Sequence, residues 1–210
     1  MIKKNLKTLI ITSIIILLPI LAGLLLWGQL PAQMPTHWNV NGEVDGWSSK
    51  AFAVFGLPLI LLAAQWLCVL GTAADPKKAN HAEKIYQLVL WIIPVINVIL
   101  SVITYAAAMG KNLPVEMILP VFMGLLFAII GNYMPKCKQN YTIGIKISWT
   151  LNSEENWNRT HRFAGRLWLV CGIVIMLTGF FGGVWAFFGI TLAMIIAPIV
   201  YSYALYRKGI

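Results

Sequence analysis

Charge is scarce in this sequence, and acidic residues are the scarcest part of it. Asp, Glu, Lys and Arg make up 11% of the 210 residues, and only 7 residues are Asp or Glu. Hydrophobic residues make up 59%, and several apolar runs approach the roughly 20 residues that a helix needs to cross a bilayer. The composition therefore excludes a soluble domain and predicts a polytopic helical membrane protein.

Cysteine is also scarce. The three cysteines, Cys68, Cys137 and Cys171, form no CxxC pair and lack the spacing of zinc ligands. We therefore expect free thiols, with no disulfide framework and no structural metal. The net charge of +9 would suggest nucleic acid as a partner of a soluble chain. Here the basic residues flank the apolar runs, so we interpret them as topology signals and expect no direct contact with nucleic acid.

Six apolar runs predict six transmembrane helices in a single all-α membrane domain. The runs cover about residues 6–27, 51–71, 85–109, 113–130, 163–180 and 184–205. Lysines precede the first run, as in a signal peptide, but the run is too long for an h-region and no cleavage site follows it. We expect it to be retained, so that six spans put both termini on one side.

Lys and Arg are distributed very unevenly between the two predicted sides. If the N-terminus lies inside, all of the 16 basic residues except Lys50 and Lys111 are also inside. Such a bias sets the orientation of membrane proteins. It predicts cytoplasmic termini, an extracytoplasmic loop at residues 29–50 and a cytoplasmic loop at residues 132–162.

The polar residues within the predicted spans are uncharged near the bilayer centre. The third helix places Asn97, Ser101 and Thr104 on one face, after a bend at Pro94, and Gln65 of the second helix is a possible partner. These groups are typical of interhelical hydrogen bonds, and a ligand cavity is the alternative. Ion-coupled transport is disfavoured, because it places ionisable groups at this depth.

Small residues recur at helical spacing in the last three spans. They are Gly124, Ala128 and Gly131; Gly165, Gly172 and Gly179; and Ala186, Gly189, Ala193, Ala197 and Ala204. Such faces let helix backbones approach closely, so we expect a tight bundle. The short connection at residues 181–183 predicts an antiparallel hairpin of the last two helices.

The predicted outer loop contains turn residues. Prolines and the pair Asn41-Gly42 indicate an ordered loop or a short hairpin, with tryptophans suited to the membrane interface. His37, Glu43 and Asp45 could bind a cation, but no further residue has ligand spacing. We predict no metal site.

The predicted inner loop is the longest polar stretch. Pro135 ends the fourth helix, and the lysines after it are placed to face anionic lipid head groups. Ser153 and the two glutamates after it are typical of a helix N-terminus. That helix carries Trp157, Thr160, His161 and Ala164 on one face. The stretch is either an amphipathic segment on the membrane, a docking surface for a cytosolic partner, or a plug over the bundle.

Both polar stretches resemble the SdpI family of bacterial membrane proteins. The outer motif is His37, Trp38, Asn39, Gly42, Asp45 and Lys50, preceded by Pro35-Thr36 and including Trp47. The inner motif is Asn132, Pro135, Lys136, Asn140, Gly144, Trp149, Thr150, Trp157, Thr160, His161, Arg162 and Gly165. The resemblance extends over essentially the whole chain.

The resemblance implies an immunity protein of the bacterial cytoplasmic membrane that protects the cell from a secreted peptide toxin. It also implies a receptor role, in which a cytosolic winged-helix repressor is held at the membrane. We expect the outer motif to meet the toxin, the inner motif to dock the repressor, and no cofactor. The first alternative is a small-molecule or lipid carrier that uses the polar face of the third helix. A membrane enzyme with His161 as base and Glu154 or Glu155 as its partner is disfavoured, because no nucleophile, metal set or oxyanion signature accompanies them.

Overall fold

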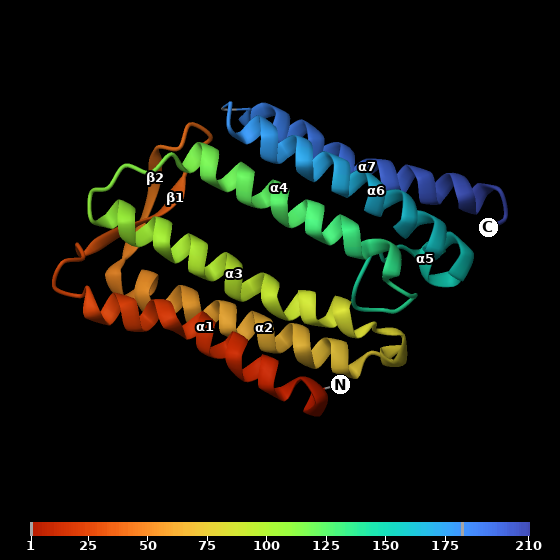
Figure 1. Ribbon diagram of the computed structural model, residues 1–210, viewed down its shortest axis with the longest axis horizontal. Coiled ribbons are helices and arrows are strands. Elements are labelled where there is room, and N and C mark those ends of the chain that lie inside the picture. Colours follow the sequence, from red (N-terminus) through yellow and green to blue (C-terminus); the bar gives the residue numbers. More distant parts are fainter. Residues whose placement is uncertain (1, 182) are drawn as a thin grey trace. The chain divides into compact units, whose positions relative to one another are not determined.

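The computed structural model describes residues 2–181 and 183–210 and is mainly helical (Figure 1). Within these residues, six helices are long and apolar enough to cross a membrane. They are α1 (Leu6–Leu25), α2 (Leu57–Ala74), α3 (Glu83–Ala108), α4 (Val115–Tyr133), α6 (Glu154–Gly179) and α7 (Val184–Arg207). The prediction of an all-α membrane fold with six spans is confirmed.

Shorter elements connect the long helices. They are the turns η1 (Lys3–Asn5), η3 (Lys78–Asn80) and η4 (Met134–Lys136), the π-helical turn η2 (Phe52–Gly56), the strands β1 (Gln33–Trp38) and β2 (Val44–Ser49), and the short helix α5 (Ser148–Asn152). The chain divides into two compact units. The first unit holds residues 2–73 and 86–115, and the second holds residues 74–85 and 116–210.

In the first unit, α1, α2 and most of α3 carry the β1–β2 hairpin. Leu30, Met34, Ala53, Val54 and Tyr105 form a buried cluster in which the base of the hairpin packs on η2 and α3. The hairpin is therefore anchored through apolar contacts and is not a free loop. The expectation of an ordered loop or hairpin after the first span is confirmed.

Polar side chains of α2 and α3 are directed to α1. The Asn97 amide donates to the Ile16 carbonyl at 2.8 Å, and the Gln65 amide donates to the Thr12 hydroxyl at 2.8 Å. Both are interhelical hydrogen bonds, as expected for polar groups in apolar surroundings. The predicted pairing of Gln65 with the α3 stripe is wrong, because Thr12 supplies the acceptor instead.

In the second unit, α4 and α6 approach backbone to backbone. A Cβ atom added at Gly172 would lie 2.5 Å from the Ala128 nitrogen, and one at Gly131 would lie 2.5 Å from the Leu169 nitrogen. The predicted close packing of these helices is confirmed. The same expectation is wrong at Gly189 of α7, where a Cβ would have no atom within 4 Å.

The helices α6 and α7 also pack together. The Trp168 indole donates to the Met194 carbonyl at 3.0 Å, and the rings of Phe163 and Tyr201 stack 4.5 Å apart. Gly182, in the predicted connection between these helices, lies outside the described residues.

The helix α6 begins at Glu154, earlier than the predicted start of the fifth span near residue 163. The Ser153 hydroxyl accepts a hydrogen bond from the Asn156 nitrogen at 3.1 Å, which is the predicted N-cap. The amphipathic segment and the apolar run after it are therefore one continuous helix.

Candidate functional site

The β1–β2 hairpin carries the outer motif. The antiparallel register is irregular near His37, which pairs with Gly46. The His37 Nδ1 lies 2.5 Å from the Asp45 Oδ1, and their side chains are 72% and 45% exposed. Gly46 makes this pairing possible, because a Cβ there would lie 2.7 Å from the His37 Cβ. The pair is an exposed polar contact on the hairpin surface.

Asn39 and Gly42 form the hairpin turn. The Asn39 Oδ1 accepts from the nitrogens of Asn41 and Glu43 at 2.9 and 3.0 Å, and its amide donates to the Glu43 carboxylate at 2.9 Å. Gly42 has a φ of 78°, a conformation that favours glycine. These two members of the outer motif therefore shape the turn.

Lys50 and Trp38 have different surroundings. The Lys50 ammonium donates to the Trp27 carbonyl at 2.9 Å and lies 4.9 Å from the centre of the Trp27 ring. Lys50 thereby ties the end of β2 to the residues after α1. Trp38 is half-buried at the end of β1, whereas Trp47 of β2 is 58% exposed. Within the outer motif, the exposed side chains are thus His37, Asp45 and Trp47.

A second polar cluster lies in the second unit. We call it the loop network; it consists of Asp75, His81, Gln139, Asn140, Thr142, Trp157 and His161. It joins the loop between α2 and α3 to the segment between α4 and α6.

Asp75 is the centre of one half of the loop network. Its side chain is fully buried and accepts from the nitrogens of Lys77 and Tyr141 at 2.7 and 2.9 Å and from the Thr142 hydroxyl at 2.9 Å. The His81 Nε2 lies 3.2 Å from the same carboxylate. Burial alone would raise the pKa of Asp75, but these hydrogen bonds and the nearby His81 outweigh burial and lower the pKa below its ordinary range.

His161 is the centre of the other half. Its Nε2 accepts from the Ile145 nitrogen at 3.0 Å, and its Nδ1 donates to the Trp157 carbonyl at 2.8 Å. Both ring nitrogens are therefore engaged, and the imidazole is held as the neutral tautomer with its proton on Nδ1. The rings of His161 and Trp157 stack 4.0 Å apart, and both side chains are fully buried.

Gly144 lets the loop cross over these rings. Its φ is 120°, and a Cβ there would lie 2.5 Å from the His161 Nε2. The Trp157 indole donates to the Cys137 carbonyl at 2.7 Å, so the loop is attached on both sides of Gly144. Burial raises the pKa of the Cys137 thiol to about 11, and a hydrogen bond from Asn140 offsets only part of this increase.

Asn140 and Thr150 fold the loop on itself. The Asn140 amide donates to the carbonyls of Lys138 and Ile143, and its oxygen accepts from the nitrogens of Thr142 and Ile143. The Thr150 hydroxyl donates to the Ile145 carbonyl at 2.8 Å and accepts from the Ile147 nitrogen at 3.1 Å. The inner motif therefore supplies most of the hydrogen bonds that give this irregular segment a single conformation.

Thr160 belongs to a neighbouring buried contact between α6 and α7. Its hydroxyl donates to the Asn156 Oδ1 at 3.1 Å, which also accepts from the Ser202 hydroxyl at 2.6 Å. The Asn156 amide donates to the carbonyls of Ser202 and Ile210. Asn156 is thus a buried hub that joins the start of α6 to the end of α7.

The remaining members of the inner motif lie nearer the surface or in helix packing. Asn132, Pro135, Lys136 and Arg162 are exposed. Trp149 is half-buried against the rings of Tyr203 and Tyr206. Gly165 is buried, where a Cβ would lie 2.6 Å from the Pro135 ring. The inner motif is therefore divided between a buried framework and an exposed basic rim.

Several residues of this site were missed by the sequence analysis. Asp75, His81, Gln139, Asn156 and Ser202 are all hydrogen-bonded in or beside the network. A signal was present for Asp75, because it is a lone acidic residue in a short loop that is otherwise basic. Its partners Tyr141 and Thr142 are more than 60 residues away in the chain, which no local pattern reveals.

The geometry offers little for metal or redox chemistry. In the described part of the chain, no three His, Cys, Asp or Glu side chains are grouped so that they could hold a metal ion. The ring nitrogens of His161 are both occupied by backbone groups, so in this conformation it is not placed to act as a general base.

The fold and these two polar elements define a multi-pass helical membrane protein with an ordered hairpin and a hydrogen-bonded loop network outside its spans. Comparison with known proteins agrees. The sequence model of the SdpI/YfhL protein family matches residues 136–202, and that of a domain of unknown function (DUF1648) matches residues 14–62. The chain is 27% identical over 209 residues to the immunity protein SdpI of Bacillus subtilis (strain 168), covering 98% of this chain and 95% of that protein. Residues 136–202 are therefore similar to the SdpI/YfhL family.

The two family matches cover different parts of the candidate site. The hairpin falls within residues 14–62, and most of the inner motif falls within residues 136–202. No solved structure matches the chain.

Proposed function

We propose that this chain is a non-enzymatic immunity protein of a bacterial cytoplasmic membrane, which protects the cell from a secreted antimicrobial peptide. The alignment with the immunity protein SdpI carries this proposal, because it extends over 98% of the chain and includes both polar elements. A membrane-embedded protein with a structured hairpin outside its spans suits a role against a peptide that acts on membranes.

The hairpin is the surface that meets the toxin in this proposal. His37 and Asp45 offer polar groups on its surface, and Trp47 offers an exposed ring on β2. An amphipathic peptide presents both kinds of partner, and aromatic side chains often dominate such contacts. Asn39, Gly42 and Lys50 contribute indirectly, since they hold the turn and the base of the hairpin.

The second part of the proposal places a cytosolic winged-helix repressor at the loop network. Trp157, Thr160 and His161 are fully buried and cannot touch a partner in this conformation. The contact would instead involve the exposed basic rim, which includes Lys136, Lys138 and Arg162. The same lysines suit anionic lipid head groups, as expected from the sequence.

Signalling between the two sides needs two arrangements of the helices. A toxin that binds one arrangement more tightly shifts the population toward it, and the repressor then binds by the same linkage. The loop network is a candidate element for this change, because it is rich in hydrogen bonds and lies outside the apolar parts of the spans. In a receptor role, the buried part of the inner motif would thus change conformation, and the exposed basic rim would contact the repressor.

The immunity proposal is tested by survival of sensitive cells that express this protein during exposure to purified candidate toxin. We expect protection, and we expect His37→Ala with Asp45→Ala to reduce it at equal protein level, because the exposed polar pair is lost. Gln33→Ala, an exposed position at the start of β1, is the matched control and should protect normally. Absence of protection by the wild-type protein at normal expression would refute the immunity role.

The repressor proposal needs a separate measurement. A fluorescently tagged winged-helix repressor from the same operon should move to the membrane on toxin exposure. We expect Arg162→Glu to reduce this recruitment while survival persists, and Lys111→Glu, a basic residue outside the rim, to leave it unchanged. Normal recruitment by Arg162→Glu together with Lys138→Glu would remove the rim from the proposal without affecting immunity.

A further inference from the structure

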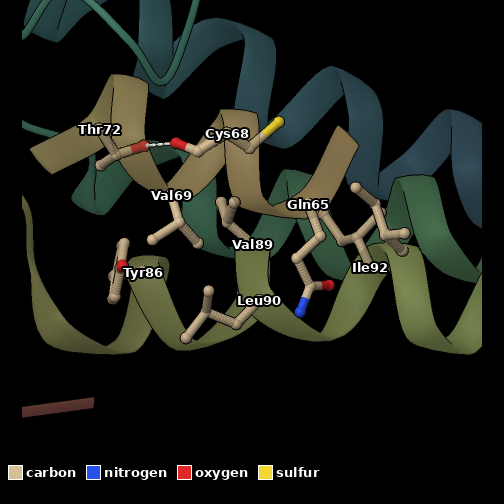
Figure 2. A pocket seen from close by; sticks show the side chains of 9 residues that line it. Gln65, Cys68, Val69, Thr72, Tyr86, Val89, Leu90 and Ile92 are labelled. Atoms are coloured by element: carbon tan, nitrogen blue, oxygen red, sulfur yellow. Dashed lines mark hydrogen bonds between the residues drawn. The ribbon is translucent and has the colours of Figure 1, made fainter. Parts of the chain in front are cut away.

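Two cavities lie between α2 and α3 within the first unit. The first has a volume of about 140 Å³ and is lined by residues that include Gln65, Cys68, Thr72 and Tyr86 (Figure 2). In this cavity the Thr72 hydroxyl already donates to the Cys68 carbonyl at 2.7 Å, and the Gln65 amide is used by Thr12. The Gln65 Oε1 is left as an unpaired acceptor in apolar surroundings.

The second cavity is larger and more polar. Its volume is about 190 Å³, and it is lined by Ala53, Leu57, Ile60 and Leu61 on one side and by Asn97, Leu100, Ser101, Thr104 and Tyr105 on the other. The polar stripe of α3 therefore faces an apolar wall formed by η2 and the first turns of α2. Few polar groups on a mainly apolar wall are typical of sites for small molecules.

The polar groups of this cavity lack partners within the protein. Asn97 and Thr104 are 2% and 6% exposed. The Asn97 amide nitrogen donates to the Ile16 carbonyl, which leaves its Oδ1 as a free acceptor. Across the described residues, no side chain or backbone group bonds to that oxygen or to the hydroxyls of Ser101 and Thr104. These three oxygens remain accessible to a small molecule in the cavity, which can supply the missing hydrogen bonds.

The backbone beside the cavity is also irregular. The turn η2 is π-helical over Phe52–Gly56, and Pro58 is the second residue after its end. Proline has no N–H, so a carbonyl of the preceding turn loses its helical donor. Short π-helical turns inside helices occur frequently at functional sites. This irregular turn borders the polar stripe of α3. It is a second, independent observation that points to the same cavity.

We propose that this cavity is a binding site for a small neutral amphiphile, whose head group both donates and accepts hydrogen bonds. The donor would bind the Asn97 Oδ1, and the hydroxyls of Ser101 and Thr104 would bind the acceptor. An aliphatic part would lie on Leu57, Ile60 and Leu61. No charged residue lines the cavity, so an ion would be poorly solvated there.

The size and position of the cavity limit further which ligands can bind there. A 190 Å³ cavity is comparable with one of about 150 Å³ that holds benzene, so the ligand has about six to eight non-hydrogen atoms. Ile60 is 55% exposed on the apolar surface of the unit, which makes the bilayer the route of entry. A short aliphatic alcohol or primary amide fits this description, and so does the end of a longer lipid. The site is independent of the immunity role.

The test uses the purified full-length protein in nanodiscs and a diazirine-bearing pentanol, which has eight non-hydrogen atoms, as photolabel, mapped by mass spectrometry. We expect saturable labelling of peptides that contain residues 53–61 and 97–105, with competition by 1-hexanol and much weaker competition by n-hexane. Thr104→Val keeps the side-chain shape but removes a hydroxyl, and it should weaken binding about fivefold, the effect of one hydrogen bond. Ser101→Leu should abolish labelling by filling the cavity.

The matched control is Thr72→Val, which removes a hydroxyl from the other cavity and should leave labelling of this one unchanged. A thermal melt of each variant establishes that it is folded. The proposal is overturned if n-hexane competes as well as 1-hexanol, or if Thr104→Val binds like Thr72→Val. Labelling spread along outward side chains such as Leu18 and Leu67 would also overturn it. A long-chain lipid that competes with the photolabel would identify the source of the head group as the bilayer.

Discussion

Asp75 shows how one buried charge can organise a loop. Its carboxylate is fully enclosed, yet four groups from two different segments surround it. Hydrogen bonds to a charged group contribute about 1.5–3 kcal/mol each, whereas an uncompensated buried charge is strongly unfavourable. The charged carboxylate therefore stabilises the loop network only while its donors remain in place.

The lowered pKa of Asp75 predicts acid sensitivity. Because the carboxyl has a lower pKa in the folded state than in the unfolded state, its contribution is fully present above the unfolded pKa. It is lost as the pH falls from about 4 through the folded pKa. Asp75→Asn should lower stability by about 2 kcal/mol at pH 7 and should show a smaller loss between pH 5 and 3 than the wild-type protein.

Thermal unfolding in detergent across this pH range measures the Asp75 effect. Glu154→Gln is the matched control, because Glu154 is exposed in the first turn of α6. If Asp75→Asn and the wild-type protein lose stability in parallel on acidification, the carboxylate is not the acid-sensitive group.

Local patterns predicted part of the loop network and missed the rest for a physical reason. The helical spacing of Trp157, Thr160 and His161 placed these residues on one face of a capped helix, as the structure has them. We expected that this face could dock a partner. In the structure, residues 137–147 cover the face, and the hydrogen bonds of Asn140 and the left-handed turn at Gly144 hold these residues there. The bonds to Asp75 span 66 and 67 positions, and such pairings depend on the whole fold.

At the scale of helices, small residues determine how α4 and α6 meet. Gly124, Gly131 and Gly172 each place backbone atoms of the partner helix where a Cβ would be. Dispersion contacts and close backbone approach are the main sources of helix association in a bilayer, since lipid is as apolar as the side chains. The spacing of these glycines was therefore informative from sequence alone, whereas Gly189, with the same spacing, faces open space.

The close contact between α4 and α6 predicts that one methyl group added at Gly172 lowers the stability of the protein strongly. In Gly172→Ala the added Cβ would lie 2.5 Å from the Ala128 nitrogen, so α4 and α6 must separate or distort. We expect a loss of about 1–3 kcal/mol, measured as a lower melting temperature in nanodiscs. Gly71→Ala is the matched control, because a Cβ there meets no atom within 4 Å and alanine favours the helix. Equal melting of the two variants would contradict the packing argument.

For the whole molecule, the loop network supports the count of six spans. The loop before α3 follows the second span, and the segment before α6 follows the fourth, so an even number of spans separates them. They must therefore lie on the same side of the membrane, which is required for the hydrogen bonds from Tyr141 and Thr142 to Asp75. The hairpin follows the first span and is expected on the opposite side. The sequence predicted this alternation from the apolar runs, and the direction of insertion rests on the distribution of Lys and Arg.

The direction of insertion can be measured with cysteines placed at exposed positions. Native Cys137 is a poor reporter, because it is 6% exposed and burial raises its pKa to about 11, so little thiolate forms at neutral pH. We expect Glu43→Cys in the hairpin to react with a membrane-impermeant maleimide in intact cells. Lys138→Cys, in the segment before α6, should react only after the cells are opened.

Both cysteine variants carry Cys68→Ala, Cys137→Ala and Cys171→Ala, and this cysteine-free background is the control for nonspecific labelling. If Lys138→Cys is labelled in intact cells while Glu43→Cys is protected, the protein is inserted with its basic end outward. That result would place the hairpin in the cytoplasm, out of reach of a secreted peptide, and the assignment of the hairpin as the toxin-contacting surface would have to be abandoned. Labelling of both positions only in opened cells would contradict the alternation of six spans itself.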